Sequence, residues 1–175
     1  MINSYFVDDL ESKLYRLSIK HSFSNIVFIC IGSNKIVGDS IGPIVGNKLL
    51  KKNKLKNINV IGTTTEPVNY QNIDRLSQYI EERNKDSCII SIDSAMGGIK
   101  QIGQIYVNWG NLEIGKAINK KGICKSHINI KVAVARNKNN TFDNLYELSK
   151  VKTEYIEELS ENISECILNV VNIIV

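Results

Sequence analysis

Hydrophobic and polar positions follow two periodicities along this chain, and their alternation predicts helices and strands in turn. Apolar residues spaced three and four apart predict amphipathic helices, whereas unbroken apolar or β-branched runs predict strands buried on both faces. The predicted strands cover residues 25–32, 58–62, 87–92, 102–109 and 127–135. The predicted helices cover residues 5–19, a segment beginning near residue 41, residues 69–83, and one long helix from about residue 141.

Strands that alternate with helices are typical of βαβ units. We therefore predict the α/β class, with a phosphorylase/hydrolase-like three-layer α/β/α sandwich around a mostly parallel central sheet. The chain has 175 residues, and its two prolines and eleven glycines do not gather into a linker. We expect residues 1–175 to form a single domain of ordinary size.

Composition narrows the class of protein. With 43% hydrophobic and 23% charged residues, the chain is typical of globular proteins and not of disordered ones. The longest apolar runs are too short to cross a bilayer, and the acidic start does not resemble a secretory signal. We expect a cytoplasmic protein that does not act at a membrane. Cys30 and Cys88 lie inside strand-like runs and are expected to be buried structural thiols.

A run of lysines follows the helix predicted near residue 41. It comprises Lys48, Lys51, Lys52, Lys54 and Lys56, within a chain of net charge +4. Lysines at the end of a helix complement its dipole and face solvent. Because no aromatic residues interleave with them to stack bases, nucleic acid is an unlikely partner.

Two aspartates stand where an open α/β sheet gathers its ligands, beyond the carboxyl ends of the strands. Asp39 lies in the loop between the first strand and the next helix, and Asp93 directly follows the third strand, which we expect to end there. Each has a structural alternative, since Asp39 can cap the helix and Asp93 can fix a turn.

If the two strands are neighbours, the carboxylates can approach each other. Paired carboxylates repel, so one pKa rises and the pair shares a proton, which suits acid–base hydrolysis. Two carboxylates with a histidine would instead suit a metal. His127 is the candidate histidine, and its alternative is a structural, hydrogen-bonded role at the start of the fifth strand. The glycines of the first loop match neither common nucleotide-binding pattern.

Four blocks of sequence resemble the YyaC-type sporulation proteins, in the superfamily of the germination protease and the hydrogenase maturation peptidases. The blocks are residues 28–32, 38–46, 62–68 and 92–95. The resemblance implies an α/β/α sandwich, catalytic roles for Asp39 and Asp93, and a peptidase acting in sporulation or germination. It places the protein in the forespore or spore core. The implied substrate is a protein or peptide, such as a small acid-soluble spore protein.

Supporting roles in substrate binding are expected for residues around the pair. These are Asn34, Ser40, Glu66, Ser94 and His127. In the hydrogenase-maturation branch, nickel is bound by a glutamate, an aspartate and a histidine. Ser40 stands here where that glutamate would be, and a hydroxyl is a poor nickel ligand. We predict no metal and no cofactor.

The chain departs from the YyaC-type pattern at Ser33 and Asn34, which replace a threonine and an aspartate. An alternative to catalysis is a non-catalytic sporulation protein that binds a peptide or protein in the same cleft, and a third is hydrolysis of another amide or an ester. Trp109 and the apolar C-terminal end fit either a homo-oligomer interface or the core.

Overall fold

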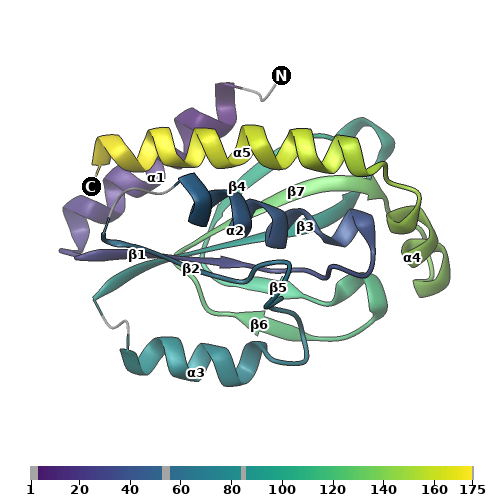
Figure 1. The fold of residues 1–175 in the computed structure, drawn as a ribbon, viewed down its shortest axis with the longest axis horizontal. Coiled ribbons are helices and arrows are strands. Elements are labelled where there is room, and N and C mark those ends of the chain that lie inside the picture. Colours follow the sequence, from purple (N-terminus) through teal and green to yellow (C-terminus); the bar gives the residue numbers. More distant parts are fainter. Residues whose placement is uncertain (1–3, 53–55, 84–85, 175) are drawn as a thin grey trace.

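A twisted five-stranded sheet forms the centre of the computed structural model, which describes residues 4–52, 56–83 and 86–174 (Figure 1). The strand order is β2-β1-β3-β7-β4. All neighbours run parallel except β4, which is antiparallel to β7. The strands are β1 Asn25–Cys30, β2 Ile58–Ile61, β3 Ser87–Gly97, β4 Ile105–Trp109 and β7 Ile128–Arg136. The predicted, mostly parallel sheet is confirmed.

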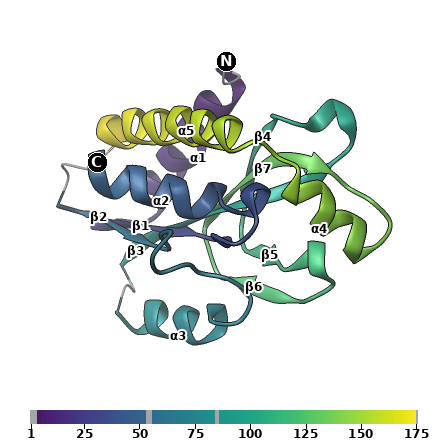
Figure 2. The ribbon, with the colours of Figure 1, turned by 45° about the vertical axis from the view of Figure 1, so that its right-hand side comes forward.

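Three helices cover one face of this sheet (Figures 1 and 2). They are α1 Ser4–Lys20, α2 Ile41–Lys52 and α5 Thr153–Ile174. The long helix α5 contacts both α1 and α2. Their apolar stripes, which include Leu10 and Ile163, meet one set of alternate strand residues, such as Phe28 and Ile90, in the larger core. Alternation along the strands sends the other set to the opposite face.

The opposite face is covered by α3 Ile73–Arg83 and by a short antiparallel hairpin (Figure 1). The hairpin consists of β5 Leu112–Ile114 and β6 Gly122–Cys124. With Val27 and Ile29 of β1, these elements form a second, smaller core. The three layers are therefore present, and half of one outer layer is a hairpin that the sequence did not predict.

Two further differences lie at the carboxyl end of the sheet. Strand β3 does not end at Asp93 but continues to Gly97, because its backbone stays paired with β7 up to Arg136. The predicted terminal helix is divided into α4 Thr141–Ser149 and α5. These differences shape the candidate site, since both the end of β3 and α4 contribute to it.

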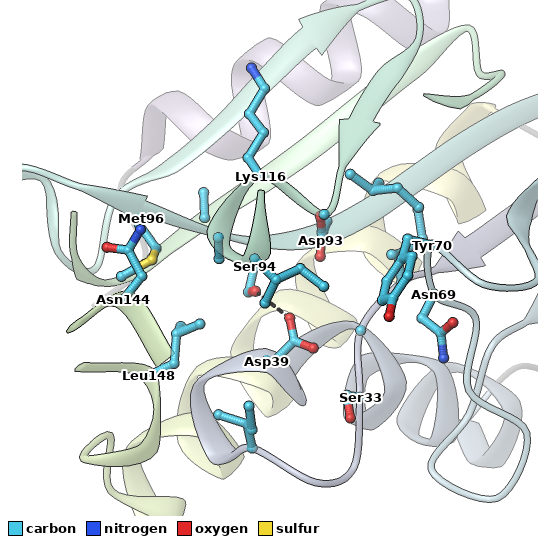
Figure 3. A pocket seen from close by; sticks show the side chains of 18 of the residues that line it. Ser33, Asp39, Asn69, Tyr70, Asp93, Ser94, Met96, Lys116, Asn144 and Leu148 are labelled. Carbon is cyan, nitrogen blue, oxygen red and sulfur yellow. Dashed lines mark hydrogen bonds between the residues drawn. The ribbon is translucent and has the colours of Figure 1, made fainter. Parts of the chain in front are cut away.

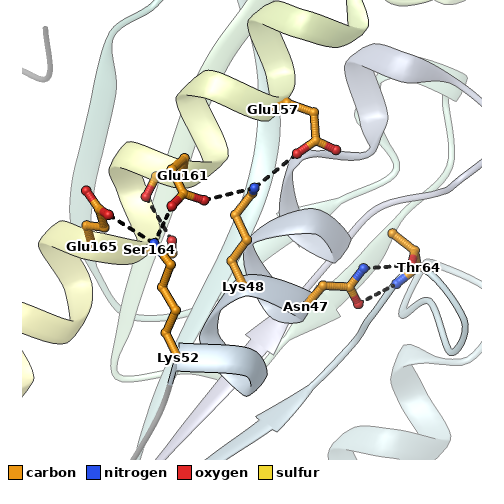
Figure 4. Close-up of polar contacts among 8 residues, drawn as sticks. All are labelled: Asn47, Lys48, Lys52, Thr64, Glu157, Glu161, Ser164 and Glu165. Carbon is orange, nitrogen blue, oxygen red and sulfur yellow. Dashed lines mark hydrogen bonds and ion pairs between the residues drawn. The ribbon is translucent and has the colours of Figure 1, made fainter.

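The lysine run has two environments. Lys51 and Lys56 are exposed, as expected for a solvated helix end, whereas Lys54 lies outside the described residues. Lys48 and Lys52 instead contact α5 (Figure 4). These two side chains remain partly exposed but are paired with acidic residues.

Glutamates of α5 pair with these two lysines and join α2 to α5 (Figure 4). The Nζ of Lys48 lies 3.0 Å from Glu157 and 2.9 Å from Glu161. Lys52 pairs with Glu161 and also with Glu165, at 3.0 Å. Because Glu161 serves both lysines, the charges form a network and not isolated pairs.

The segments considered for an oligomer interface are partly exposed. Trp109 keeps 48% of its surface exposed, and the ammonium of Lys13 lies 5.8 Å from its ring centroid. Near the C-terminus, Val170 and Val171 are buried whereas Ile173 is exposed. In the described ranges, no helix has the length and apolar character that crossing a bilayer requires.

Candidate active site

Asp39 is placed by a tight turn between β1 and α2. The turn ends in a short 3₁₀ helix, η1 Val37–Asp39. Its backbone is tied to β1, since the Ser33 N–H donates to the Asp39 carbonyl at 2.9 Å. Gly42 lets the start of α2 approach β1, because a Cβ there would lie 2.1 Å from the Ile31 carbonyl oxygen. The sequence therefore fixes Asp39 at the carboxyl end of β1.

Asp93 belongs to a central strand with partners on both sides. It follows the last residue of β3 that pairs with β1 and lies opposite Lys131 of β7. Ser94 then bridges the two acids. Its backbone amide bonds to Asp93, and its Oγ donates to Oδ1 of Asp39 at 3.2 Å (Figure 3). The side chain of Asp39 is thus engaged across the site.

Both aspartates line one cavity of about 710 Å³ at the carboxyl edge of the sheet (Figure 3). Each is half-buried and keeps part of its surface open. Tyr70 and Asn69 lie on one side of Asp39, and Met96 and Leu148 on the other. The volume is in the usual range for small-molecule and peptide side-chain sites.

The environment shifts both carboxyl groups towards the protonated form. Burial raises the pKa of Asp39 to about 6, against a smaller lowering by the Ser94 hydroxyl. Burial and the charge of Asp39 raise the pKa of Asp93 well above its ordinary value, while the Ser94 amide and Lys131 partly oppose this rise. Both carboxyl groups therefore favour the protonated form more than an ordinary aspartate does, and the charge of Asp39 is one reason for the shift at Asp93.

Four of the seven predicted site residues come together in this cavity. Asp39, Asp93, Asn34 and Ser94 all line it. The Nδ2 of Asn34 donates to the Thr64 carbonyl at 2.9 Å, which leaves its side-chain oxygen for a ligand.

The other three do not line it. Ser40 is buried and donates from Oγ to the Val37 carbonyl at 2.7 Å, so it closes the η1 turn. Glu66 is exposed in a turn, and its backbone amide donates to the Thr63 hydroxyl and so fixes that turn. His127 precedes β7 at the amino end of the sheet, where its Nδ1 accepts from the Ile89 amide. Four residues separate it from Lys131, or about 13 Å along a strand.

Residues from several other segments line the cavity and were not predicted, among them Asn69 and Tyr70 of the loop before α3. Lys131 is the clearest, since it is the one charged residue among the apolar positions 128–135, and this isolation was a usable signal. Others come from η3 Lys116–Ile118, which follows β5, and from α4. Nothing local in the sequence marks them, because tertiary packing brings them to the site.

The nickel site of the hydrogenase-maturation branch does not fit the residues present. Ser40 is turned to a backbone carbonyl, and His127 lies at the other end of the sheet. Among the residues that the structure describes, no three histidine, cysteine or acidic side chains are grouped to hold a metal ion.

The fold is an α/β/α sandwich like that of the hydrogenase maturation proteases. The crystal structure of the NiFe hydrogenase maturation protease HycI from Thermococcus kodakarensis KOD1 matches with a TM-score of 0.57 and 15% identity, covering 85% of this chain and 93% of that one. HybD from Thermococcus kodakarensis gives a TM-score of 0.38 at 15% identity, covering 80% and 99% of the two chains.

The sequence places the chain in a particular family. The family model described as "Protein of unknown function (DUF1256)" matches residues 3–166, and the chain belongs to this family. The uncharacterised protein YyaC of Bacillus subtilis (strain 168) is 35% identical over 95 residues. That match covers 54% of this chain and 46% of YyaC, so it spans less than half the length of this relative.

Proposed function

We propose that this chain is a peptidase-like hydrolase in which Asp39 and Asp93 act on an amide bond with a water molecule. One observation carries the proposal: two half-buried carboxyl groups, each with a pKa raised by burial, line the same open cavity. Two such carboxyl groups can divide the roles of base and acid between them. The fold shared with hydrogenase maturation proteases supports a hydrolase but does not by itself assign the reaction.

In the proposed reaction Asp39 is the base and Asp93 is the acid, because the charge of Asp39 favours a proton on Asp93. Ionised Asp39 accepts a proton from water as the water oxygen bonds to the amide carbon. Protonated Asp93 gives its proton to the leaving nitrogen as the C–N bond breaks. Asp39 then carries a proton and Asp93 does not, so one proton transfer through solvent restores the starting state. Water supplies every atom added to the products.

Two neighbours assist in this scheme. Lys131 lies opposite Asp93 on β7 and lines the cavity, so its ammonium can stabilise negative charge that develops on the substrate carbonyl oxygen. Ser94 binds Asp39 through its hydroxyl and Asp93 through its backbone amide, and so fixes the position of the two carboxyl groups relative to each other.

We propose a protein or peptide substrate met during sporulation or germination, such as a small acid-soluble spore protein. The likeness of the sequence blocks to YyaC-type proteins supports this setting, and it implies a forespore or spore-core location. The proposal concerns the biological role, which is separable from the chemistry of the site.

The test is hydrolysis by purified protein, first of small acid-soluble spore proteins and then of a mixed peptide library, with new amino termini read by mass spectrometry. Asp39→Asn and Asp93→Asn should each lower the rate at least a hundredfold. Asp74→Asn, an exposed change at the start of α3, is the matched control. The rate should rise with pH through about 6, as Asp39 ionises.

The result separates the alternatives. If peptides bind but no amide bond is cut between pH 5 and 9, the site is a peptide-binding cleft and the hydrolase proposal fails. If esters or other amides are cut and peptides are not, the carboxyl pair acts on a different substrate class.

A further inference from the structure

The cavity has two chemically distinct parts. Polar side chains surround the acids, and the lining also includes six apolar side chains, from the residue before η1, the end of β3, η3 and α4, that we call the apolar wall. The wall consists of Ile36, Met96, Ala117, Ile118, Leu145 and Leu148. Asn144 lies beside Met96 at this wall (Figure 3). In Figure 3, Met96 and Leu148 lie together on one side of Asp39, away from Tyr70. A water molecule between two carboxylates does not require this additional apolar space.

The wall is rigidly placed relative to the acids. Helix α4 contacts both η1, which carries Asp39, and η3. Gly38 of η1 lies directly against Leu148, since a Cβ there would be 2.8 Å from the Leu148 carbonyl oxygen. Asn144 of α4 is fixed by a hydrogen bond, in which its Oδ1 accepts from the Lys138 amide at 2.8 Å. The wall is therefore an existing surface and needs no rearrangement to form.

The end of β3 connects the acids directly to the wall. Asp93, Ser94, Ala95 and Met96 are consecutive and all line the cavity. In a regular strand these side chains would alternate between faces, but the pairing with β7 shifts register between Ala95 and Met96. The extra residue at this irregularity is Val134 of β7, because Ala95 pairs with Ala133 and Met96 with Ala135. Met96 lines the same cavity as Asp93 at the carboxyl end of β3.

Most of the wall keeps apolar surface facing the cavity. Leu148 is buried in the core, whereas Met96, Ile118 and Leu145 are only half-buried. Exposed apolar surface that is continuous with a polar site is typical of a ligand pocket. A peptide with its amide at the acids has its next Cα within about 4 Å, so a neighbouring side chain reaches the wall.

We infer that the apolar wall is a side-chain subsite, and that the substrate is a peptide with an aliphatic residue adjoining the cleaved bond. This inference rests on the proposed function for the position of the bond. Leucine, isoleucine, methionine and valine match the wall in size and chemistry, whereas a charged side chain would lose its hydration against it. A hydrophobic pocket of this kind discriminates by roughly tenfold to two-hundredfold.

Methyl NMR of the whole wild-type chain tests the subsite without requiring hydrolysis. The probes are the N-acetyl N-methylamides of leucine, glycine and aspartate. The leucine probe should shift the methyl signals of Met96 and Ile118 and bind at least tenfold more tightly than the other two. Ile118→Asn should remove this preference. Ile123→Asn, the same change at an exposed position on the same hairpin, should not.

Equal binding of the three probes, or shifts confined to residues outside the wall, would overturn the subsite. The test is separable from that of the reaction. Leucine-selective binding at the wall without cleavage of any peptide supports the subsite and refutes the hydrolase. Cleavage that is indifferent to the adjoining residue supports the hydrolase and refutes the subsite.

Discussion

The hydroxyl of Ser94 donates a hydrogen bond of 3.2 Å to the carboxylate of Asp39, across the gap between β3 and η1. The same residue binds Asp93 through its backbone amide. Ser94 thus contacts both acids with different groups, and only the contact to Asp39 depends on its side chain. This separation allows the two acids to be perturbed independently.

Ser94→Ala should raise the pKa of Asp39 further above about 6, because the hydroxyl stabilises the ionised carboxylate. The measurement is a ¹³C NMR titration of the aspartate carboxyl carbons. Ser33→Ala, which changes another hydroxyl lining the cavity, is the control. An unchanged titration of Asp39 in Ser94→Ala would contradict the hydrogen bond. If hydrolysis is observed, the acidic limb of its pH profile should move to higher pH with the titration.

Asp39→Asn should stabilise the fold at pH 7.5 but not at pH 3. Burial raises the pKa of this carboxyl from 3.8 to about 6, so ionisation costs the folded state free energy. The cost is absent below pH 3.8, grows as the pH rises to about 6, and is constant above. Removing the charge should raise the free energy of unfolding by up to about 3 kcal/mol at pH 7.5. The lost contact with Ser94 reduces this gain.

Urea unfolding at the two pH values measures this difference. Asp74→Asn at an exposed position provides the baseline for losing one carboxylate. A gain for Asp39→Asn of the same size at pH 3 as at pH 7.5 would show that ionisation is not its source.

Glu161→Gln should lower the free energy of unfolding by about 1 kcal/mol at neutral pH and low salt, because it weakens the ion pairs between α2 and α5. The hydrogen bonds from Lys52 and Lys48 lower the pKa of Glu161 to about 2. Their contribution is therefore complete above pH 4.5 and is lost as the pH falls towards 2. Because the side chain is 41% exposed, solvent screens the pairs and the effect stays small.

Thermal unfolding in low salt and in 1 M NaCl checks this network. The loss caused by Glu161→Gln should shrink in high salt, and Glu158→Gln on the exposed surface of α5 should show a smaller change. Equal losses for the two variants would mean that the network adds nothing to stability.

Gly42→Ala should destabilise the protein by at least about 2 kcal/mol. The added Cβ would lie 2.1 Å from the carbonyl oxygen of Ile31 and 2.8 Å from its nitrogen, so only a shift of the backbone could relieve the contact. Gly98→Ala is a matched control, since its Cβ would meet only Gln101 Oε1 at 3.5 Å. That change should stay within about 0.5 kcal/mol. Chemical denaturation of both variants gives the comparison.

Much of the fold could be predicted because its strands are strongly apolar and its helices strongly periodic. The elements that were missed lack such a signal. Strands β5 and β6 have three residues each, too few to show an alternation. The extension of β3 through residues 93–97 contains serine, alanine and glycine, which look like a turn and stay extended only through pairing with β7.

The candidate site was predictable only as far as strand order places it. Asp39 and Asp93 follow neighbouring parallel strands, so the rule for strand ends brings them together. His127 was misplaced because a residue that opens a parallel strand lies at the opposite edge from one that ends a strand. Met96 and Leu148 reach the cavity through the extension of β3 and the packing of α4, neither of which has a local signature.

The acids and the surroundings that face a ligand come from different kinds of segment. Asp39 and Asp93 are anchored to the five-stranded sheet, whereas η3 sits on the separate β5–β6 hairpin and α4 follows the last strand. Changes in the hairpin, or at the α4 side chains that do not contact η1, can therefore alter what is recognised while the acids stay on the sheet. Members of the family that share the acid pair can thus diverge in ligand, and residues 116–118 and 145–148 are where that divergence should be sought.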